Sequence, residues 1–476
     1  LLLYIALPPR WNEGLFWAYT VLQTFVSLSV TVEAVHSIRP AILARRARRK
    51  AEKEGFPDLA REKDCPFFDI VVVAYLPNEA DIILKQMRYI IRQLRYSASR
   101  FNLMVVYNTP KPMEALEAEM QALAGRYDNV QVHKVLGSKS KCDNVNYYLK
   151  NVSSIADIVA IFDADHCPEA CALHWAARCF KTGDIDVVQG NIHASTMLTE
   201  TLLCTGRCCI YNFDETWLTR LVAAEFDAIY GCFHLGRAAG EFGGSNGYWN
   251  ASLLRSLGMD GRMLTEDIDA TMRAITSGAR VAYDIKIVSF ETAPTTFKAL
   301  LKQRLRWSQG WTQVALRHSL TAIKRGAHGA KLRSRLGMWF LLPFREMYFL
   351  SAAAIAQHVS LQTCLLLAYV ILNPPRTFAD FWYGLTGYHV TNWLLAFNII
   401  SLATVSMINL RNRSPFTRPW AIILFGICCP LWFTMSSIGA VFAHFRQVAK
   451  YEKWNPTARG APKPKVVIAA PRVDAE

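Results

Sequence analysis

The sequence contains no C-x-x-C pair, although it has 12 cysteines. Cys167 with Cys171, and Cys204 with Cys208 and Cys209, come nearest to clusters, and their spacing is not that of zinc ligands. The pattern therefore disfavours a zinc site and favours free thiols in a reducing compartment.

Acidic residues are scarce relative to basic ones: 38 Asp and Glu against 53 Lys and Arg give a formal net charge of +15. Such a surplus can indicate a nucleic-acid-binding protein. Here the positive charge lies beside apolar segments, as in the basic run from Arg45 to Lys50. This placement is typical of the cytosolic flank of a membrane helix, so we expect membrane lipid, and no nucleic acid, as a partner.

Charged residues are nearly absent near the N-terminus. Within Leu15–Val35 the only one is Glu33. The segment is about as long as the roughly 20 residues needed to cross the hydrocarbon core. It is therefore a candidate transmembrane helix, and its basic C-terminal flank places the following residues in the cytosol.

The chain becomes apolar again after residue 336, and Met347–Leu372, Trp393–Leu410 and Trp420–Val441 are each candidates to span. The last candidate has basic residues on both flanks, Arg411, Arg413 and Arg418 before it and Arg446, Lys450 and Lys453 after it. The positive-inside rule cannot satisfy both flanks of a single crossing, so the number of spans stays open.

Between the apolar regions, strand-like and helix-like segments alternate. Short β-branched runs predict strands at 69–75, 101–107, 130–135 and 158–162, and apolar periodicity predicts helices at 79–94 and 113–124. This alternation predicts a doubly wound, mostly parallel α/β sheet, whose ligands bind beyond the carboxyl ends of the strands.

Two aspartates, Asp163 and Asp165, close the last of these strands. Carboxylates at i and i+2 on a strand end can reach one hard divalent cation and a neighbouring ribose. Because Asp also favours turns, a polar strand exit explains the pair equally well.

The run Leu264–Asp269 precedes a helical pattern that extends to Gly278. Thr265 suits an N-cap, and acids in the first turn complement the helix dipole. The functional alternative is that one carboxylate, held at the helix start, is a general base toward a sugar hydroxyl.

The run Gln303–Trp307 opens an amphipathic stretch that extends to Leu320. A basic helix at the membrane interface accounts for this pattern. Arginine forks also match phosphate oxygens, and an indole face packs on a pyranose. The run therefore also suits a diphosphate beside a stacked sugar.

In order and spacing, these motifs resemble the processive family 2 glycosyltransferases, the superfamily of cellulose, chitin, hyaluronan and β-glucan synthases. Its D-x-D motif is matched by Asp163 and Asp165, its T-E-D by Thr265–Asp267, and its Q-x-x-R-W by Gln303, Arg306 and Trp307. Phe242–Gly247 resembles the acceptor-side loop, and Ser140–Asn146 resembles the Lys-and-Asn segment. The resemblance covers about residues 67–320.

The resemblance implies a GT-A-type α/β catalytic domain with flanking transmembrane helices. It also implies an inverting transfer that extends a growing β-linked polysaccharide from a nucleotide sugar donor. Asp267, supported by Glu266, is implied as the general base, and Asp165 as the ligand of Mg²⁺ or Mn²⁺. The other implied roles are nucleotide and diphosphate binding by Asp163, Lys141, Gln303, Arg304 and Arg306, and acceptor binding by Trp307, Gly244, Ser245 and Asn246.

The sequence departs from the family after the second strand. Acidic residues usually lie there near the nucleobase, whereas this chain has Tyr107–Pro110. Asn108 can hydrogen-bond a base but carries no charge, so the resemblance does not extend to the nucleotide. The neutral loop Phe242–Trp249 favours a glucose- or mannose-type donor, and we expect UDP-glucose.

The expected organisation is a transmembrane segment at 1–40, a basic cytosolic linker at 41–64 and the catalytic domain at 65–300. Amphipathic interface helices follow at 301–345, then transmembrane helices at 346–445 and a flexible tail at 446–476. We expect the protein in the plasma membrane with its catalytic domain in the cytosol.

Two other classes remain in view. A lipid-linked monosaccharide transferase shares the D-x-D domain but transfers one sugar to a polyprenyl phosphate; the Q-x-x-R-W run and the late apolar segments disfavour it. A non-catalytic membrane protein, such as a transporter, does not account for the paired carboxylates beside an Arg/Trp motif.

Overall fold

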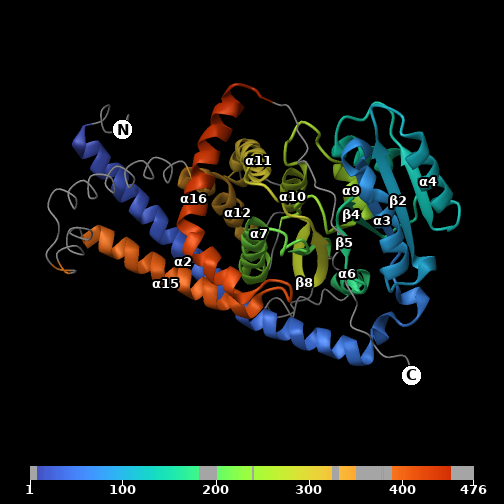
Figure 1. The fold of residues 1–476 in the computed structure, drawn as a ribbon, viewed down its shortest axis with the longest axis horizontal. Coiled ribbons are helices and arrows are strands. Elements are labelled where there is room, and N and C mark those ends of the chain that lie inside the picture. The colour runs from blue at the N-terminus through green and yellow to red at the C-terminus, as the bar shows by residue number, and fades with distance from the viewer. Residues whose placement is uncertain are drawn as a thin grey trace.

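The computed structural model describes residues 8–181, 201–237, 241–323, 332–349, 377, 379 and 389–451. Within them lies a sheet of 8 strands in the order β3-β2-β1-β4-β7-β6-β8-β5 (Figure 1). The strands are β1 (Phe68–Tyr75), β2 (Phe101–Asn108), β3 (Val130–Lys134), β4 (Ile158–Asp163), β5 (Cys167–Pro168), β6 (Thr201–Ile210), β7 (Gly247–Asn250) and β8 (Arg280–Glu291).

The first four strands by sequence are parallel, as predicted, and their ends lie within one residue of the predicted ends. Beyond β4 the sheet is mixed: β7 is antiparallel to both β4 and β6, β6 and β8 are parallel, and β5 is antiparallel to β8. The predicted α/β class is confirmed, with antiparallel strands in its second half.

Both faces of the sheet are covered, which is why its central strands are continuous apolar runs. In β1, Ile70 and Val72 pack into the core on one face, and Val71 and Val73 into the core on the other. The first face carries α3 (Leu76–Gln93), α4 (Glu114–Ala124) and α6 (Ala172–Lys181). The second carries α5 (Lys141–Asn151), α9 (Ala251–Leu257) and α10 (Glu266–Thr276).

The N-terminal helix α2 (Pro9–Glu54) extends well past the sheet and packs along α15 (His389–Asn412) (Figure 1). Hydrogen bonds join the two helices, including one of 2.7 Å between the hydroxyls of Thr31 and Ser401. Residues 41–54, which we predicted as part of a linker, continue α2 instead. They dock on the part of the molecule that contains the sheet, because Arg48 pairs with Glu169 and donates to the Lys286 carbonyl.

Two described helical segments are long and apolar enough to cross a membrane, Thr20–Glu54 in α2 and Pro419–Val448, which is α16. The first overlaps the predicted span Leu15–Val35 from Thr20 on, and the second contains the predicted span Trp420–Val441. The predicted span Trp393–Leu410 falls within α15, whereas most of Met347–Leu372 and of the tail lies outside the described residues.

Both basic flanks of α16 contact helices that lie beside the sheet. On one side the Ser414 amide donates to Asp227 over 3.1 Å, and on the other the Tyr451 carbonyl accepts from Gln309 over 2.7 Å. Asp227 belongs to α7 (Trp217–Ala228), and Gln309 to α11 (Phe297–Ile323). The remaining elements are η1 (Pro57–Leu59), η2 (Glu62–Asp64), η3 (Ala98–Arg100), the π-helical η5 (Ile229–His234), α8 (Leu235–Arg237), α12 (Leu332–Trp339) and the π-helical η6 (Phe340–Phe344).

Candidate active site

A cleft of about 740 Å³ opens at the carboxyl ends of β1, β2 and β4, beside the first residues of α10. This is the edge at which ligands of such sheets bind. The sequence motifs come from distant parts of the chain, and the fold brings most of them to this one place. The predicted residues that line it are Lys141, Asp163, Asp165, Gly244, Glu266, Asp267, Gln303, Arg306 and Trp307.

The two aspartates of the D-x-D motif lie at and just past the end of β4. Asp163 pairs with Lys141, the first residue of α5, and the same ammonium donates to the Gly244 carbonyl. Asp165 accepts a hydrogen bond of 2.8 Å from the hydroxyl of Thr292, which follows β8. Side chains from two distant parts of the chain, Lys141 and Thr292, therefore hold the two carboxylates.

The donor set at this strand end suits a hard divalent cation. Ligand atoms of Asp163, Asp165 and His166 all lie within 4.8 Å of one another, and carboxylate oxygens are ligands that Mg²⁺ and Mn²⁺ prefer. Sequence reasoning missed His166, although it directly follows the motif. Its buried ring lies 3.4 Å from Glu291 and 3.3 Å from the Ser289 hydroxyl.

The acceptor-side loop lies beside these aspartates because β7 is antiparallel to β4, with Gly247 opposite Ile161. Gly244 has φ 88°, in the left-handed region that favours glycine. A Cβ on Gly244 would lie 3.0 Å from Asp267 Oδ2 and 3.4 Å from Lys141 Nζ. Glycine thus lets the loop backbone approach both charged groups.

Ser245 and Asn246, predicted as acceptor-binding residues, do not line the cleft. The Ser245 hydroxyl accepts from the Asp163 amide over 3.2 Å, and the buried Asn246 amide donates to the Arg207 carbonyl over 3.1 Å. Their side chains shape the loop and hold it against the sheet.

The T-E-D run occupies the start of α10, as the helical pattern predicted. Thr265 is at the N-cap position, but its side chain makes no capping hydrogen bond. Instead it packs against α11, where a Cβ on Gly310 would lie 2.3 Å from Thr265 Cγ2. The close contact sets where Glu266 and Asp267 enter the cleft.

The ionisable groups around Asp267 perturb one another. Burial, and then the neighbouring Glu266 carboxylate, raise the pKa of Asp267 to about 7. Burial also raises the pKa of Glu266. For Lys141 burial acts to lower the pKa, but Asp163, Glu266 and Asp267 outweigh it and raise the pKa overall. A carboxylate with a pKa near neutrality is suited to proton transfer.

The Q-x-x-R-W run lies on α11, where Gln303, Arg306 and Trp307 line the cleft. Arg304 does not line it, which differs from its predicted contact with a diphosphate. Its guanidinium pairs with Glu225 of α7 over 2.5 Å and lies 4.5 Å from the centre of the Trp307 ring. Glu225 also accepts from the Trp432 indole of α16 over 3.0 Å, so Arg304 braces Trp307 against two helices.

Other residues that line the cleft belong to none of the sequence motifs. Glu291, Asn212 and Glu215 line the wall near the start of α11. Asn108, considered for the nucleobase, is buried and bonded within the chain: its oxygen accepts from Asn144 over 2.9 Å, and its amide donates to the Ser138 carbonyl over 3.1 Å.

Comparison with known proteins identifies the family of the chain. The model of the family "Glycosyltransferase like family 2" matches residues 66–310, which is more than half of the chain. The protein therefore belongs to this family, and its sheet with the cleft at its edge is the GT-A-type fold expected from the sequence.

Three proteins of known name are similar in sequence to this chain. Probable glycosyltransferase YdaM of Bacillus subtilis (strain 168) is 22% identical over 296 residues, 60% of this chain and 64% of YdaM. Glucomannan 4-beta-mannosyltransferase 7 of Arabidopsis thaliana is 30% identical over 158 residues, 32% of this chain and 26% of that protein.

Poly-beta-1,6-N-acetyl-D-glucosamine synthase of Staphylococcus aureus (strain COL) is 29% identical over 192 residues, 39% of this chain and 42% of the synthase. The chain thus matches less than two thirds of the length of each of these relatives. Polysaccharide synthases are among its homologues.

Proposed function

We propose that the protein is a membrane-embedded, inverting hexosyltransferase that polymerises a nucleotide sugar into a β-linked polysaccharide. The observation that carries this proposal is the meeting of the D-x-D, T-E-D and Q-x-x-R-W motifs in one cleft. The family match and the polysaccharide synthases among the relatives support it.

In the proposed reaction Asp267 is the general base. Its carboxylate takes the proton from the terminal hydroxyl of the growing chain, and that oxygen bonds to the anomeric carbon of the donor. The bond from this carbon to the diphosphate breaks at the same time, and its electron pair leaves with the nucleoside diphosphate. A single displacement of this kind converts an α-linked donor into a β-linked product.

Two further sets of side chains orient the reactants. Gln303 and Arg306 lie where they can hold the diphosphate, and Trp307 offers an indole face on which the acceptor sugar can pack. Asp163, which pairs with Lys141, would contact the nucleoside. Glu266 supports Asp267 by raising its pKa.

A divalent ion, Mg²⁺ or Mn²⁺, would be held by Asp165 with Asp163 and His166 beside it, and when bound supplies charge stabilisation on the departing diphosphate. Thr292 holds the Asp165 carboxylate in orientation through its 2.8 Å hydrogen bond.

The membrane assignment rests on the two long apolar helical segments. Helix α16 packs along α11, which carries Trp307, and is joined to Arg304 through Glu225. An acceptor packed on Trp307 thus lies next to a candidate membrane helix, which supports passage of the polymer across the membrane from a cytosolic cleft.

For the donor we propose a glucose- or mannose-type nucleotide sugar, with UDP-glucose tested first. Purified protein in lipid nanodiscs would be incubated with radiolabelled UDP-glucose, GDP-mannose and UDP-N-acetylglucosamine in turn, each with Mg²⁺ and with Mn²⁺. We expect label in a polymer from one of these donors. Label only in a solvent-extractable lipid would instead indicate a single transfer to a polyprenyl acceptor, and no label from any of the three would refute the proposed donor class.

A further inference from the structure

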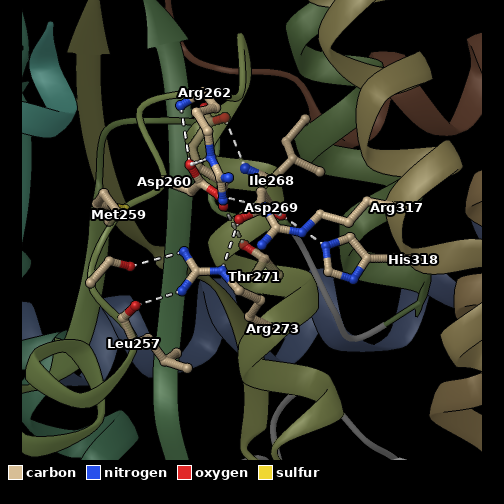
Figure 2. Close-up of polar contacts among 12 residues, drawn as sticks. Leu257, Met259, Asp260, Arg262, Ile268, Asp269, Thr271, Arg273, Arg317 and His318 are labelled. Atoms are coloured by element: carbon tan, nitrogen blue, oxygen red, sulfur yellow. Dashed lines mark hydrogen bonds and ion pairs between the residues drawn. The ribbon is translucent and has the colours of Figure 1, made fainter.

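Behind the cleft, on the same helix as the proposed base, lies a fully buried carboxylate that the proposed reaction does not use. Asp269 has none of its surface exposed, and its side chain faces α11. Its Oδ1 accepts from His318 Nε2 over 2.8 Å and lies 3.1 Å from Arg317, and its Oδ2 accepts from Arg273 Nε over 2.8 Å (Figure 2). We call Asp269, Arg273, Arg317 and His318 the Asp269 cluster.

The cluster also holds the loop that leads into α10. Arg273 donates to the carbonyls of Leu257 and Gly258 over 2.6 and 2.9 Å. Arg317 donates to the Asp260 carboxylate over 2.7 Å (Figure 2). One buried carboxylate thus joins α10, α11 and the segment between α9 and α10.

Asp269 is ionised in this setting. Burial acts to raise its pKa, but hydrogen bonds from His318 and Arg273 and the nearby guanidinium groups outweigh burial and lower the pKa. A buried ion pair is often no more stabilising than an apolar contact of the same size, because desolvation offsets the attraction. The cluster is therefore better explained by the geometry it imposes than by added stability.

That geometry concerns the reacting groups. Helix α10 carries Asp267 two residues before Asp269, and α11 carries Trp307 eleven residues before His318, about 16 Å along the helix at 1.5 Å per residue. The helices also meet where Thr265 packs on Gly310, and where the Leu264 amide donates to Gln313 over 2.9 Å. These contacts lie near the start of α10, whereas the Asp269 cluster fixes the helix one turn further on.

We propose that the hydrogen bond between His318 and Asp269 makes His318 a positioning residue for the transfer step, because it fixes the base Asp267 relative to the side chains of α11 that hold diphosphate and acceptor. The inference rests on the proposed function and adds a residue to it that touches neither substrate nor metal. Displacement of a catalytic group by about 1 Å can cost 10²-fold in rate, so loss of this contact should act mainly on kcat.

The test compares His318→Ala with His318→Gln, because the Gln amide nitrogen can replace Nε2 as the donor to Asp269. The matched control is Ser319→Ala on the same helix, whose hydroxyl donates to the Ala315 carbonyl within α11. Each variant would be purified as the full chain in nanodiscs. Sugar transfer at saturating donor, the KM for donor and the melting temperature would be measured.

We expect His318→Ala to lose at least about tenfold in kcat with little change in donor KM. His318→Gln should restore most of the rate, and Ser319→Ala should behave as wild type. Equal losses in the Ala and Gln variants, or wild-type kcat in His318→Ala, would overturn the proposal. So would a rate loss that disappears when the variants are assayed well below their melting temperatures, since that pattern indicates a purely stabilising role.

Hydrogen exchange provides a readout that needs no activity. His318→Ala should speed amide exchange in residues 264–270, and His318→Gln should not. Unchanged exchange would contradict the positioning role even if sugar transfer is never detected. Conversely, the wild-type protein could transfer no sugar while His318→Ala and His318→Gln still differ in amide exchange as expected. That result would refute the proposed function and leave the positioning contact standing.

Discussion

The general base is the residue whose replacement separates catalysis from binding most cleanly. In Asp267→Asn the side chain keeps its shape and can still accept the 2.8 Å hydrogen bond from the Ile268 amide. It cannot take a proton from a sugar hydroxyl. Loss of a general base typically costs about 10²–10⁴-fold in rate, so we expect polymer synthesis to fall by that factor while nucleotide binding stays nearly intact.

The same change should stabilise the folded protein. The pKa of Asp267 is raised from 3.8 to about 7, and one unit corresponds to about 1.4 kcal/mol. The full shift would amount to about 4 kcal/mol, which partial exposure to cleft water reduces to about 1–2 kcal/mol. For a domain of this size the melting temperature should rise by about 2–8 °C.

The pH dependence of this gain has a definite sign. Because the folded-state pKa is raised, Asp267 favours folding when protonated, and that contribution is lost as pH rises through about 7. The Asn side chain does not ionise, so the variant does not lose this stability. Its free energy of unfolding should therefore exceed that of wild type by the full amount above about pH 7, and the difference should shrink toward pH 4. Wild-type activity should fall as pH drops below about 7, because the base becomes protonated.

The assay measures sugar incorporation at saturating donor, nucleotide binding by calorimetry, and melting temperature at several pH values. Glu266→Gln is the matched control, since it neutralises the adjacent carboxyl. Glu266→Gln should lower the rate of sugar transfer less than Asp267→Asn does. An Asp267→Asn enzyme that polymerises at more than about a tenth of the normal rate would refute the assignment, and a reversed ranking would transfer the role to Glu266.

Three other perturbations test separate parts of the account. Asp165→Asn removes the charge of one hard oxygen ligand, so activity and its response to Mg²⁺ or Mn²⁺ should both be lost; full wild-type activity in a chelator would disprove the metal site. Gly310→Ala should lower kcat by up to about 10²-fold by pushing Thr265 and the start of α10. The control Gly337→Ala, whose added Cβ meets nothing within 4 Å, should leave kcat unchanged. A glycosylation tag inserted after the exposed Gly55, at the end of α2, should stay unmodified in a eukaryotic host, whereas a tag that acquires glycan would place the cleft outside the cytosol.

The first half of the sheet could be predicted from sequence because its strands are short apolar runs that end in turn residues. The second half could not. In β8 the charged residues Asp284 and Lys286 lie within the strand, buried and paired over 3.3 Å, which breaks the apolar pattern. In β7 only four residues pair, too few for a pattern to appear.

Within the site, motif spacing predicted which residues meet but not which way each one faces. Gln303, Arg306 and Trp307 are spaced i, i+3 and i+4 and share one face of α11. Arg304 is one residue further round the helix from Gln303 and faces Glu225 instead. Likewise, Glu291 ends a strand without any motif, so only the fold brings it to the cleft.

Asn246 shows a second limit of sequence reasoning. It lies in the expected loop, but its φ of 55° turns the side chain into the sheet, where it donates to a backbone carbonyl. A backbone conformation of this kind is set by contacts with β6 that are distant in sequence.

The size of the product tests the central claim most directly. Purified protein in nanodiscs would be given its preferred radiolabelled donor in large excess, and the product would be sized by gel filtration after a small fraction of the donor has been used. A processive polysaccharide synthase should yield long chains at this early time, with few short ones. Label confined to a single sugar on lipid, or to short chains that lengthen together, would contradict the account.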